Sequence, residues 1–232
     1  MVVRGNFRPP TLVTVDVFKS GLEQFINEPD IEKEDALLVT EMTLEHLLDS
    51  YGVIDDKDFL DRADLLSCLG QTTIISNCNN HQRLINYLSH YKIDKLGIVI
   101  GVLEFLEIIN EKFYQNQDGR LLVAFGELFT RNIKIFVYPA LQDNESKKLL
   151  TAQNLPVPQG IKFLYKHLLD SKQVVEVENY NPDLLHIFPH EVLMMIKEGK
   201  EGWQNMIPAK LAKLIEQERL LGLPERKINV EV

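Results

Sequence analysis

Three short runs of β-branched and apolar residues, separated by segments of helical periodicity, constrain the fold of this chain more than any other feature. The runs cover residues 72–76, 95–101 and 132–138. The middle run, Lys95-Leu-Gly-Ile-Val-Ile-Gly101, is nearly uninterrupted, as expected for a parallel strand that is covered on both faces. Strands that alternate with helices pair in parallel through right-handed crossovers. We therefore expect an α/β fold with a Rossmann-like, three-layer, mostly parallel sheet.

The remaining elements complete a single α/β domain over residues 1–232. Residues 11–18 are rich in β-branched side chains and are expected to form the first strand. Apolar spacing then predicts a helical insertion over residues 20–70 and a mostly helical C-terminal region over residues 157–223. The expected helices cover residues 20–27, 34–51, 55–69, 80–90, 103–114, 119–130, 160–171, 184–197 and 209–221, and a short strand covers residues 174–177.

The composition excludes several classes of function. The formal net charge of −9 argues against nucleic acid or an anionic membrane as the main partner. Two cysteines cannot form a disulfide framework, so a reducing cytoplasm is the expected setting. The first ten residues contain no apolar core of the kind found in a signal peptide, and no apolar run is long enough to span a membrane. A cytoplasmic, soluble protein is expected, and the oligomeric state stays open.

The segment from Gln71 to Leu88 is the strongest candidate for a binding site. A short β-branched run ends in Ser76-Asn77, passes through a polar turn and enters an amphipathic helix. This arrangement presents a hydroxyl group and free backbone N–H groups at the carboxyl end of a strand, where anions and phosphates bind. His81 and Arg83 fall in the first turn of that helix and are expected to contact the anion.

The segment Val15-Asp-Val-Phe-Lys-Ser-Gly-Leu22 resembles the first motif of the haloacid-dehalogenase-like superfamily, and Ile74-Ile-Ser-Asn77 resembles its second. The resemblance implies that Asp16 ends a strand as the catalytic nucleophile and that Ser20, Ser76 and Asn77 bind the substrate. It also implies a cap domain, for which residues 20–70 are the candidate. Mg²⁺ would be bound by Asp16 with Glu104 or Glu107, and Lys92 or Lys95 would be the superfamily's lysine.

The whole chain also resembles an uncharacterised bacterial protein family through a set of scattered segments. These are residues 15–22, 58–64, 74–77, 97–101, 136–139 and 185–188. Members of that family are often labelled nicotinate- or nicotinamide-nucleotide adenylyltransferases. Such enzymes carry a His-x-x-His or His-x-Gly-His signature after the first strand, and no such signature follows Val13. The resemblance therefore implies a fold and a bacterial cytoplasmic setting rather than this activity.

Two other patterns are interpreted as structural. No G-x-G-x-x-G fingerprint follows the expected first strand, which argues against a dinucleotide-dependent dehydrogenase. His186 and His190 are four residues apart, but Pro189 interrupts the helix between them, so a helical metal pair is not expected.

Two hypotheses for the function remain open. In the first, the carboxyl ends of the strands bind, and in an active enzyme hydrolyse, an anionic or phosphorylated small metabolite, with Mg²⁺ as the cofactor if the site is catalytic. In the second, the chain is a non-catalytic regulatory or protein-interaction module with a degenerate hydrolase-like fold. Phe18 favours the second hypothesis, because most phosphatases of the superfamily have a second acid at that position.

Overall fold

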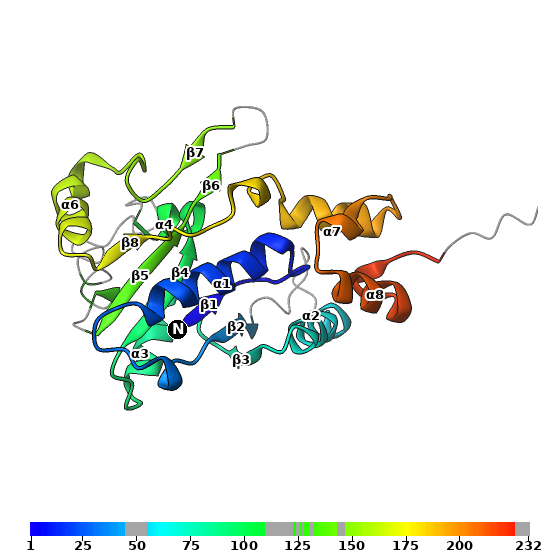
Figure 1. The fold of residues 1–232 in the computed structure, drawn as a ribbon, viewed down its shortest axis with the longest axis horizontal. Helices are drawn as coiled ribbons and strands as arrows, with labels where there is room; N and C mark the ends of the chain where they lie inside the picture. The colour runs from blue at the N-terminus through cyan, green and yellow to red at the C-terminus, as the bar shows by residue number, and fades with distance from the viewer. Residues whose placement is uncertain are drawn as a thin grey trace, which may run out of the picture.

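A computed structural model of the chain describes residues 1–44, 55–109, 123, 126, 128–129, 132–142 and 147–225. It confirms the α/β fold, with a six-stranded, all-parallel sheet in the order β3-β2-β1-β4-β5-β8 (Figure 1). The sheet strands are β1 (Val2–Arg4), β2 (Val39–Thr43), β3 (Thr72–Ser76), β4 (Leu96–Gly101), β5 (Ile133–Tyr138) and β8 (Val174–Glu176). Two short strands, β6 (Ala140–Leu141) and β7 (Leu149–Leu150), form a separate antiparallel pair.

The order of the strands creates one topological switch point. Counted along the chain, the six sheet strands run 3-2-1-4-5-6, the order of the Rossmann-like, doubly wound α/β fold. β1 lies between β2 and β4. The helix that follows β1 packs on one face of the sheet, and the helix that follows β4 packs on the other. In open α/β sheets of this kind, ligands bind at the carboxyl ends of the two strands that flank the switch.

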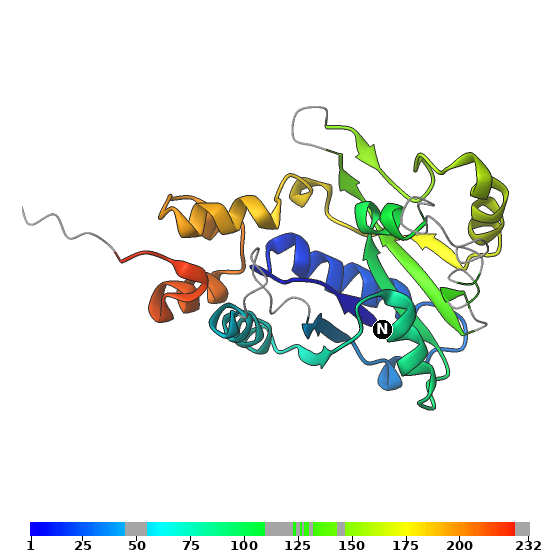
Figure 2. The ribbon, with the colours of Figure 1, turned by 180° about the vertical axis from the view of Figure 1, so that it is seen from behind.

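Helices cover both faces of this sheet. Helices α1 (Leu12–Ile26) and α2 (Asp56–Cys68) lie on one face, and α3 (His81–Ser89), α4 (Val102–Ile109) and α6 (Lys162–Asp170) lie on the other (Figures 1 and 2). The chain continues through α7 (Pro189–Lys197) and α8 (Ala209–Glu218). Short 3₁₀ turns occur at Lys33–Asp35, Gln159–Ile161, Pro182–Leu184, Trp203–Asn205 and Leu220–Gly222.

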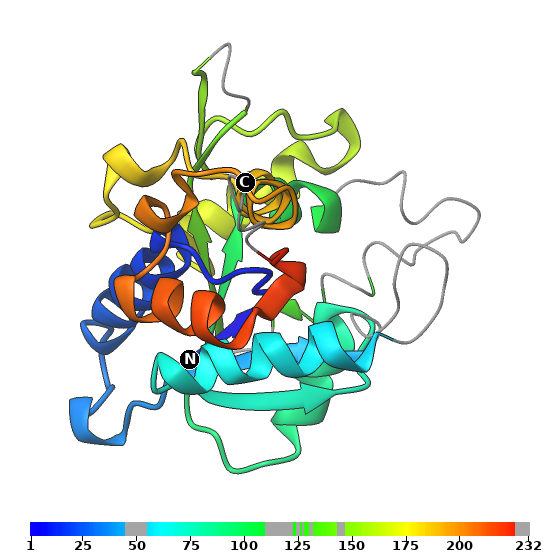
Figure 3. The same ribbon diagram turned by 90° about the vertical axis from the view of Figure 1, so that its right-hand side faces the viewer.

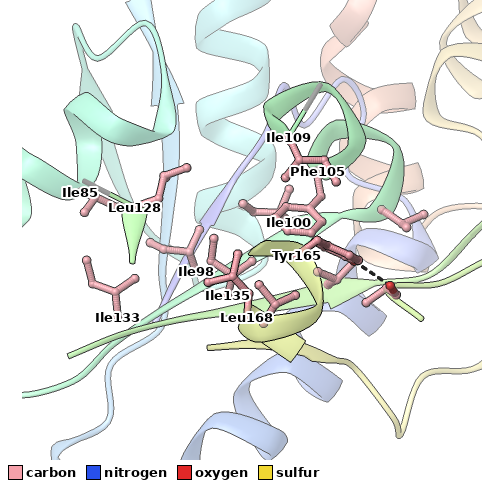
Figure 4. Packing of buried hydrophobic residues seen from close by; sticks show 14 of the residues in the cluster. Ile85, Ile98, Ile100, Phe105, Ile109, Leu128, Ile133, Ile135, Tyr165 and Leu168 are labelled. Carbon is pink, nitrogen blue, oxygen red and sulfur yellow. Dashed lines mark hydrogen bonds between the residues drawn. The ribbon is translucent and has the colours of Figure 1, made fainter. Parts of the chain in front are cut away.

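The core is built by the alternation of side chains along the buried strands. In β4, Ile98 and Ile100 point toward α4 and α6, where they pack with Phe105 and Tyr165 (Figure 4). The intervening Val99 points to the opposite face and packs with residues of α1. This period of two is the geometry of an extended strand, and it explains why a strand buried on both faces is apolar at nearly every position.

The C-terminal helical region is confirmed and lies beside the carboxyl edge of the sheet. Trp203 is 1% exposed and packs in a cluster that joins α7 and α8 to Leu65 of α2. The Leu12 N–H, at the start of α1, donates to the Met206 carbonyl at 2.9 Å. Figure 3 shows α8 next to α2, with α7 seen nearly end-on farther from α2. The region therefore fixes the start of α1 as well as adding helices to the fold.

Three expectations about the first seventy residues are wrong. Residues 12–26 form a helix, not a strand, and the first strand is Val2–Arg4. The expected helix over residues 34–51 is replaced at Val39–Thr43 by β2, which pairs with β1 and β3. The interval from 20 to 70 thus contributes a strand to the sheet itself. Residues 45–51 of that expected helix lie outside the described part of the chain.

Most of the other expected elements are found close to their predicted positions, but the helix expected over residues 184–197 begins only at Pro189, after a 3₁₀ turn at Pro182–Leu184. Of the helices expected over residues 103–114 and 119–130, the structure describes α4 and only single residues beyond it. Among the described residues, no helix is both long enough and apolar enough to cross a membrane.

Candidate functional site

A pocket of about 520 Å³ lies at the switch point, where the carboxyl ends of β1 and β4 meet. Its volume falls within the range of about 300–1,000 Å³ that is usual for small-molecule sites. The wall is formed by the end of β1 and the loop after it, by α1, by β4 and by the start of α7. The lining residues used below are Gly5, Arg8, Thr14, Gly101, Pro189 and His190.

The loop from Gly5 to Pro9 lines the pocket, and contacts with Glu41, Arg62 and Phe18 hold it in place. The Gly5 N–H donates to the Glu41 carbonyl at 3.2 Å, and the Asn6 carbonyl accepts from Arg62 Nη1 at 3.2 Å. Phe7 has a φ of 48°, in the left-handed region that non-glycine residues rarely adopt. Its buried ring packs 5.9 Å from the ring of Phe18, which holds that backbone conformation in place.

Arg8 is the more exposed of the two arginines that line this pocket. Its Nε donates to Asp58 Oδ1 at 2.6 Å, and Asp58 Oδ2 lies 2.9 Å from Arg62 Nε, so one carboxylate orients two guanidinium groups. The Arg8 side chain is 32% exposed. Within the described residues, no hydrogen bond from its two terminal nitrogens is found. Arg8 is therefore fixed at one edge of its guanidinium and free to donate at the other.

Two helix N-termini also reach the pocket. At the start of α1, Thr11 and Thr14 form a reciprocal capping box, and Thr14 lines the pocket. At the start of α7, the Phe188 side chain provides no cap, and Pro189 and His190 line the pocket. Helix N-termini carry partial positive charge, so both starts favour a negatively charged ligand.

A buried polar cluster lies on the other face of the same edge of the sheet. We define the Arg4 cluster as Arg4, Glu41, Ser76, His81 and Glu104. Arg4 Nε lies 3.1 Å from Glu41 Oε2, and an Arg4 terminal nitrogen donates to the Cys78 carbonyl. The Ser76 hydroxyl donates to Glu41 and accepts from the Cys78 N–H at 3.0 Å. His81 Nε2 lies 3.6 Å from Glu104 Oε1.

Desolvation shifts the pKa values of His81, Glu104 and Glu41 in the Arg4 cluster. Desolvation, with a smaller contribution from the Arg4 charge, lowers the pKa of His81 to about 3, so the imidazole is neutral near pH 7. Desolvation also raises the pKa of Glu104 to about 7, against the opposing effect of Arg4. Burial raises the pKa of Glu41 as well, while Ser76 and Arg4 act in the opposite direction.

The structure brings together three of the residues predicted from the sequence. Ser76, His81 and Glu104 all belong to the Arg4 cluster. Asn77 lies in the turn after β3 and is exposed. Arg83 is also exposed, and its backbone N–H donates to Asn80 Oδ1 at 2.8 Å. Asn80, which the sequence analysis did not single out, is thus the N-cap of α3.

The expected position of Asp16 at the end of a strand is wrong. Asp16 and Ser20 lie one turn apart on α1, and the buried Ser20 hydroxyl donates to the Asp16 carbonyl at 2.6 Å. The Asp16 carboxylate accepts from the Tyr138 hydroxyl at 2.6 Å and from the Asn181 N–H at 2.8 Å. These bonds tie α1 to β5 and to the segment before α7.

The expected magnesium site is not assembled by these residues. Asp16 is on α1 and Glu104 is on α4, and these helices cover opposite faces of the sheet. No group of three or more His, Cys, Asp or Glu side chains suited to a metal ion occurs in the described part of the chain. Lys92 and Lys95 precede β4 and line a different pocket, together with Met1 and Leu96, at the amino ends of the strands.

No protein-family model and no curated protein sequence matches this chain. Because the first strand of the structure ends at Arg4, the histidine pair of the adenylyltransferase signature would follow Arg4. No histidine precedes His46, however, and Thr11 and Thr14 lie at the start of α1. The interpretation that the chain lacks this signature therefore holds for the strand that the structure identifies as the first.

Four residues at this edge of the sheet were missed by the sequence analysis. Arg4 and Arg8 were overlooked because the first strand was expected at residues 11–18. Glu41 was overlooked because a helix was expected around it, and His190 was considered only as half of a histidine pair that is not expected to bind a metal. The arginines could have been found from the order of residues at the start of the chain. An apolar pair and Arg4 are followed by Gly5 and by Pro9-Pro10, a pattern that indicates a short strand and then a loop.

Proposed function

We propose that this protein binds a phosphorylated small molecule in the pocket at the switch point between β1 and β4, and that Arg8 is the main contact to the phosphate. The observation that carries this proposal is the state of the Arg8 side chain. Its Nε is held by Asp58, its residue lines a pocket of about 520 Å³, and no hydrogen bond of its terminal nitrogens is found among the described residues. A guanidinium held in this way presents a pre-oriented pair of donors to phosphate oxygens.

The surroundings of Arg8 support the same ligand class. The positive ends of α1 and α7 both reach the pocket, and they add attraction for an anion. Gly101 has open space where a Cβ atom would stand, so a ligand could approach the backbone there. The overall charge of −9 makes a local concentration of donors more selective for small anions than for nucleic acid.

Hydrolysis of the ligand is a separate question. The resemblance to the haloacid-dehalogenase-like superfamily implies an aspartate nucleophile at a strand end, whereas Asp16 lies on a helix with two hydrogen bonds to its carboxylate. The proposal is therefore binding, without an assigned reaction or magnesium ion. Membership of the uncharacterised bacterial family stays a prediction, and the proposal does not depend on it.

Two arginine variants test the position of the site. Binding of inorganic phosphate and of ribose 5-phosphate should be measured by calorimetry and by thermal shift, since a ligand that binds only the folded protein raises its melting temperature. Arg8→Gln should weaken both ligands by about 10- to 100-fold, the effect of losing a hydrogen bond to a charged group. Arg83→Gln is the matched control, because Arg83 is the exposed arginine that sequence analysis assigned to the substrate.

The result with Arg83 separates two sites. Loss of binding in Arg83→Gln but not in Arg8→Gln would place the anion at the start of α3 and refute the proposal. A cooperatively folded protein that binds no phosphorylated probe would instead favour the second hypothesis, a non-catalytic interaction module.

A further inference from the structure

The Arg4 cluster contains buried polar atoms that its own internal bonds do not satisfy. Arg4 Nη1 and His81 Nε2 are both buried and have no hydrogen-bond partner within the described residues. The residues that carry them are 9% and 5% exposed. Glu104, which lies 3.6 Å from His81 Nε2, has a side chain that is 44% exposed and thus connects the cluster to solvent. Buried polar atoms without partners are costly, which makes a ligand that satisfies them favourable.

The mixture of donors and acceptors restricts the chemistry of that ligand. A second anion would meet the carboxylates of Glu41 and Glu104, and a cation would meet the guanidinium of Arg4. An apolar group would leave the unpartnered atoms buried and unsatisfied. A hydroxyl group both donates and accepts, so neighbouring hydroxyls can satisfy a guanidinium, a neutral imidazole and a carboxylate together.

We infer that the Arg4 cluster binds the hydroxyl groups of a sugar or polyol phosphate whose phosphate is bound at Arg8, with Glu104 as the acceptor that the ligand meets first. This inference rests on the proposed function and narrows its ligand class. Glu104 and His81 determine which phosphorylated compound is preferred, while Arg8 contributes affinity for any of them.

The position of the cluster relative to the pocket supports a single ligand. Arg4 lines the pocket at the switch point and is also the central residue of the cluster. Gly101 lines the pocket, and Glu104 follows it within the first turn of α4. A molecule that crosses the ends of β1 and β4 therefore passes from Arg8 on one face of the sheet to Glu104 on the other, as ligands do at a topological switch point.

The test compares three probes of graded hydroxyl content, namely inorganic phosphate, 2-deoxyribose 5-phosphate and ribose 5-phosphate. Calorimetry on the full chain should show ribose 5-phosphate binding at least about 10-fold more tightly than inorganic phosphate, with the deoxy sugar between them. Glu104→Gln should bring this preference close to one while it changes inorganic phosphate binding by no more than about twofold. Glu107→Gln, on the same helix and exposed, should leave the preference unchanged.

The outcomes distinguish this inference from the proposed function. A preference for ribose 5-phosphate that survives Glu104→Gln, or no preference in a wild-type protein that binds phosphate through Arg8, overturns the inference alone. Phosphate binding that is absent, or that is unaffected by Arg8→Gln, overturns the proposed function and the inference with it. Urea unfolding of Glu104→Gln confirms that the variant is folded before its binding is compared.

Discussion

Asp16 and Tyr138 are joined by a hydrogen bond of 2.6 Å between the Tyr138 hydroxyl and Asp16 Oδ2, across the interface between α1 and β5. The same oxygen accepts from the Asn181 N–H. Burial and the neighbouring carboxylate raise the pKa of Tyr138 well above its usual value, so the phenol stays protonated as a donor. The aspartate that the motif resemblance implied as a nucleophile thus connects the sheet, α1 and the segment that leads to α7.

Removing this bond should destabilise the fold. Tyr138→Phe leaves the ring and deletes the donor, so the free energy of unfolding should fall by about 2 kcal/mol, the usual range for a bond to a charged group. Urea denaturation measures this loss. Tyr180→Phe is the control, because the Tyr180 ring packs 5.9 Å from the Tyr138 ring but no hydrogen bond of its hydroxyl is found among the described residues. Equal losses in both variants would mean that the Asp16 bond contributes nothing specific.

Asp58 should be the most sensitive carboxylate of α2. It orients Arg8 and pairs with Arg62, whose side chain is 2% exposed. Asp58→Asn removes the carboxylate charge that pairs with the buried Arg62, and breaking a buried pair from one side costs about 3–5 kcal/mol. Chemical denaturation should show this loss, whereas Asp64→Asn, at an exposed position of the same helix, should change stability by less than about 0.5 kcal/mol. A loss below 1 kcal/mol in Asp58→Asn would contradict the geometry.

His81 should make the protein sensitive to acid. Its pKa is about 3 in the folded state and 6.5 when unfolded, so below pH 6.5 the unfolded chain binds a proton that the folded protein does not. Its contribution to stability is complete above pH 6.5 and is lost as the pH falls toward 3, by at most about 1.4 kcal/mol per pH unit. Between pH 7 and pH 4, the unfolding free energy of the wild type should therefore fall relative to that of His81→Gln by up to this amount per pH unit. Parallel curves would show that the imidazole is not desolvated.

Glu104 should contribute a pH dependence of the opposite sign. Its pKa rises from 4.5 to about 7 on folding, so between these values the folded protein binds the extra proton. The contribution of Glu104 is present below pH 4.5 and is lost as the pH rises to about 7. Relative to Glu104→Gln, the wild type should therefore lose stability across this window. Because the side chain is 44% exposed, solvent screening should make the slope shallower than that of His81.

Two glycines of β4 should respond differently to a methyl group. A Cβ atom on Gly97 would lie 2.6 Å from Phe25 Cδ2 and 3.0 Å from Phe136 Cε2, inside van der Waals contact. Gly97→Ala should therefore destabilise the fold by about 1–3 kcal/mol through overpacking. Gly101→Ala, which meets nothing within 4 Å, should be close to neutral. Thermal melts of the pair provide the comparison, and equal effects would argue against close approach of α1 to the sheet at Gly97.

The sequence predicted the second half of the sheet well because its signals are strong and local. The β4 run is apolar at most positions, and Asp55 and Asn80 cap the helices that they precede. The prediction failed where local preference and packing disagree. Residues 11–18 contain several β-branched side chains, but the Thr11 capping box and the burial of Phe18 and Phe25 favour a helix by more than the few tenths of a kcal/mol that β-branching costs.

The candidate site could be predicted only in part for the same reason. Ser76 and His81 were found because the strand and helix around them were found. Arg4 lies on β1, and a three-residue strand carries too little periodicity to be recognised. Glu41 lies on β2, in a segment whose apolar spacing predicted a helix. Their pairing also depends on the register of two parallel strands, in which Arg4 is opposite Glu41. Register of this kind is set by the whole sheet and is not encoded in either segment alone.

The shortness of β1 has a consequence for how ligand binding could be observed. Val2–Arg4 alone joins β2 and β3 to β4, β5 and β8, through three paired residues on one side and two on the other. Local opening of this strand would separate the two parts of the sheet, so the exchange rate of its amide protons measures how often they separate. A molecule bound across the ends of β1 and β4 would oppose that opening. Slower hydrogen–deuterium exchange in β1 would then record occupancy of the switch point, even for a ligand that undergoes no reaction.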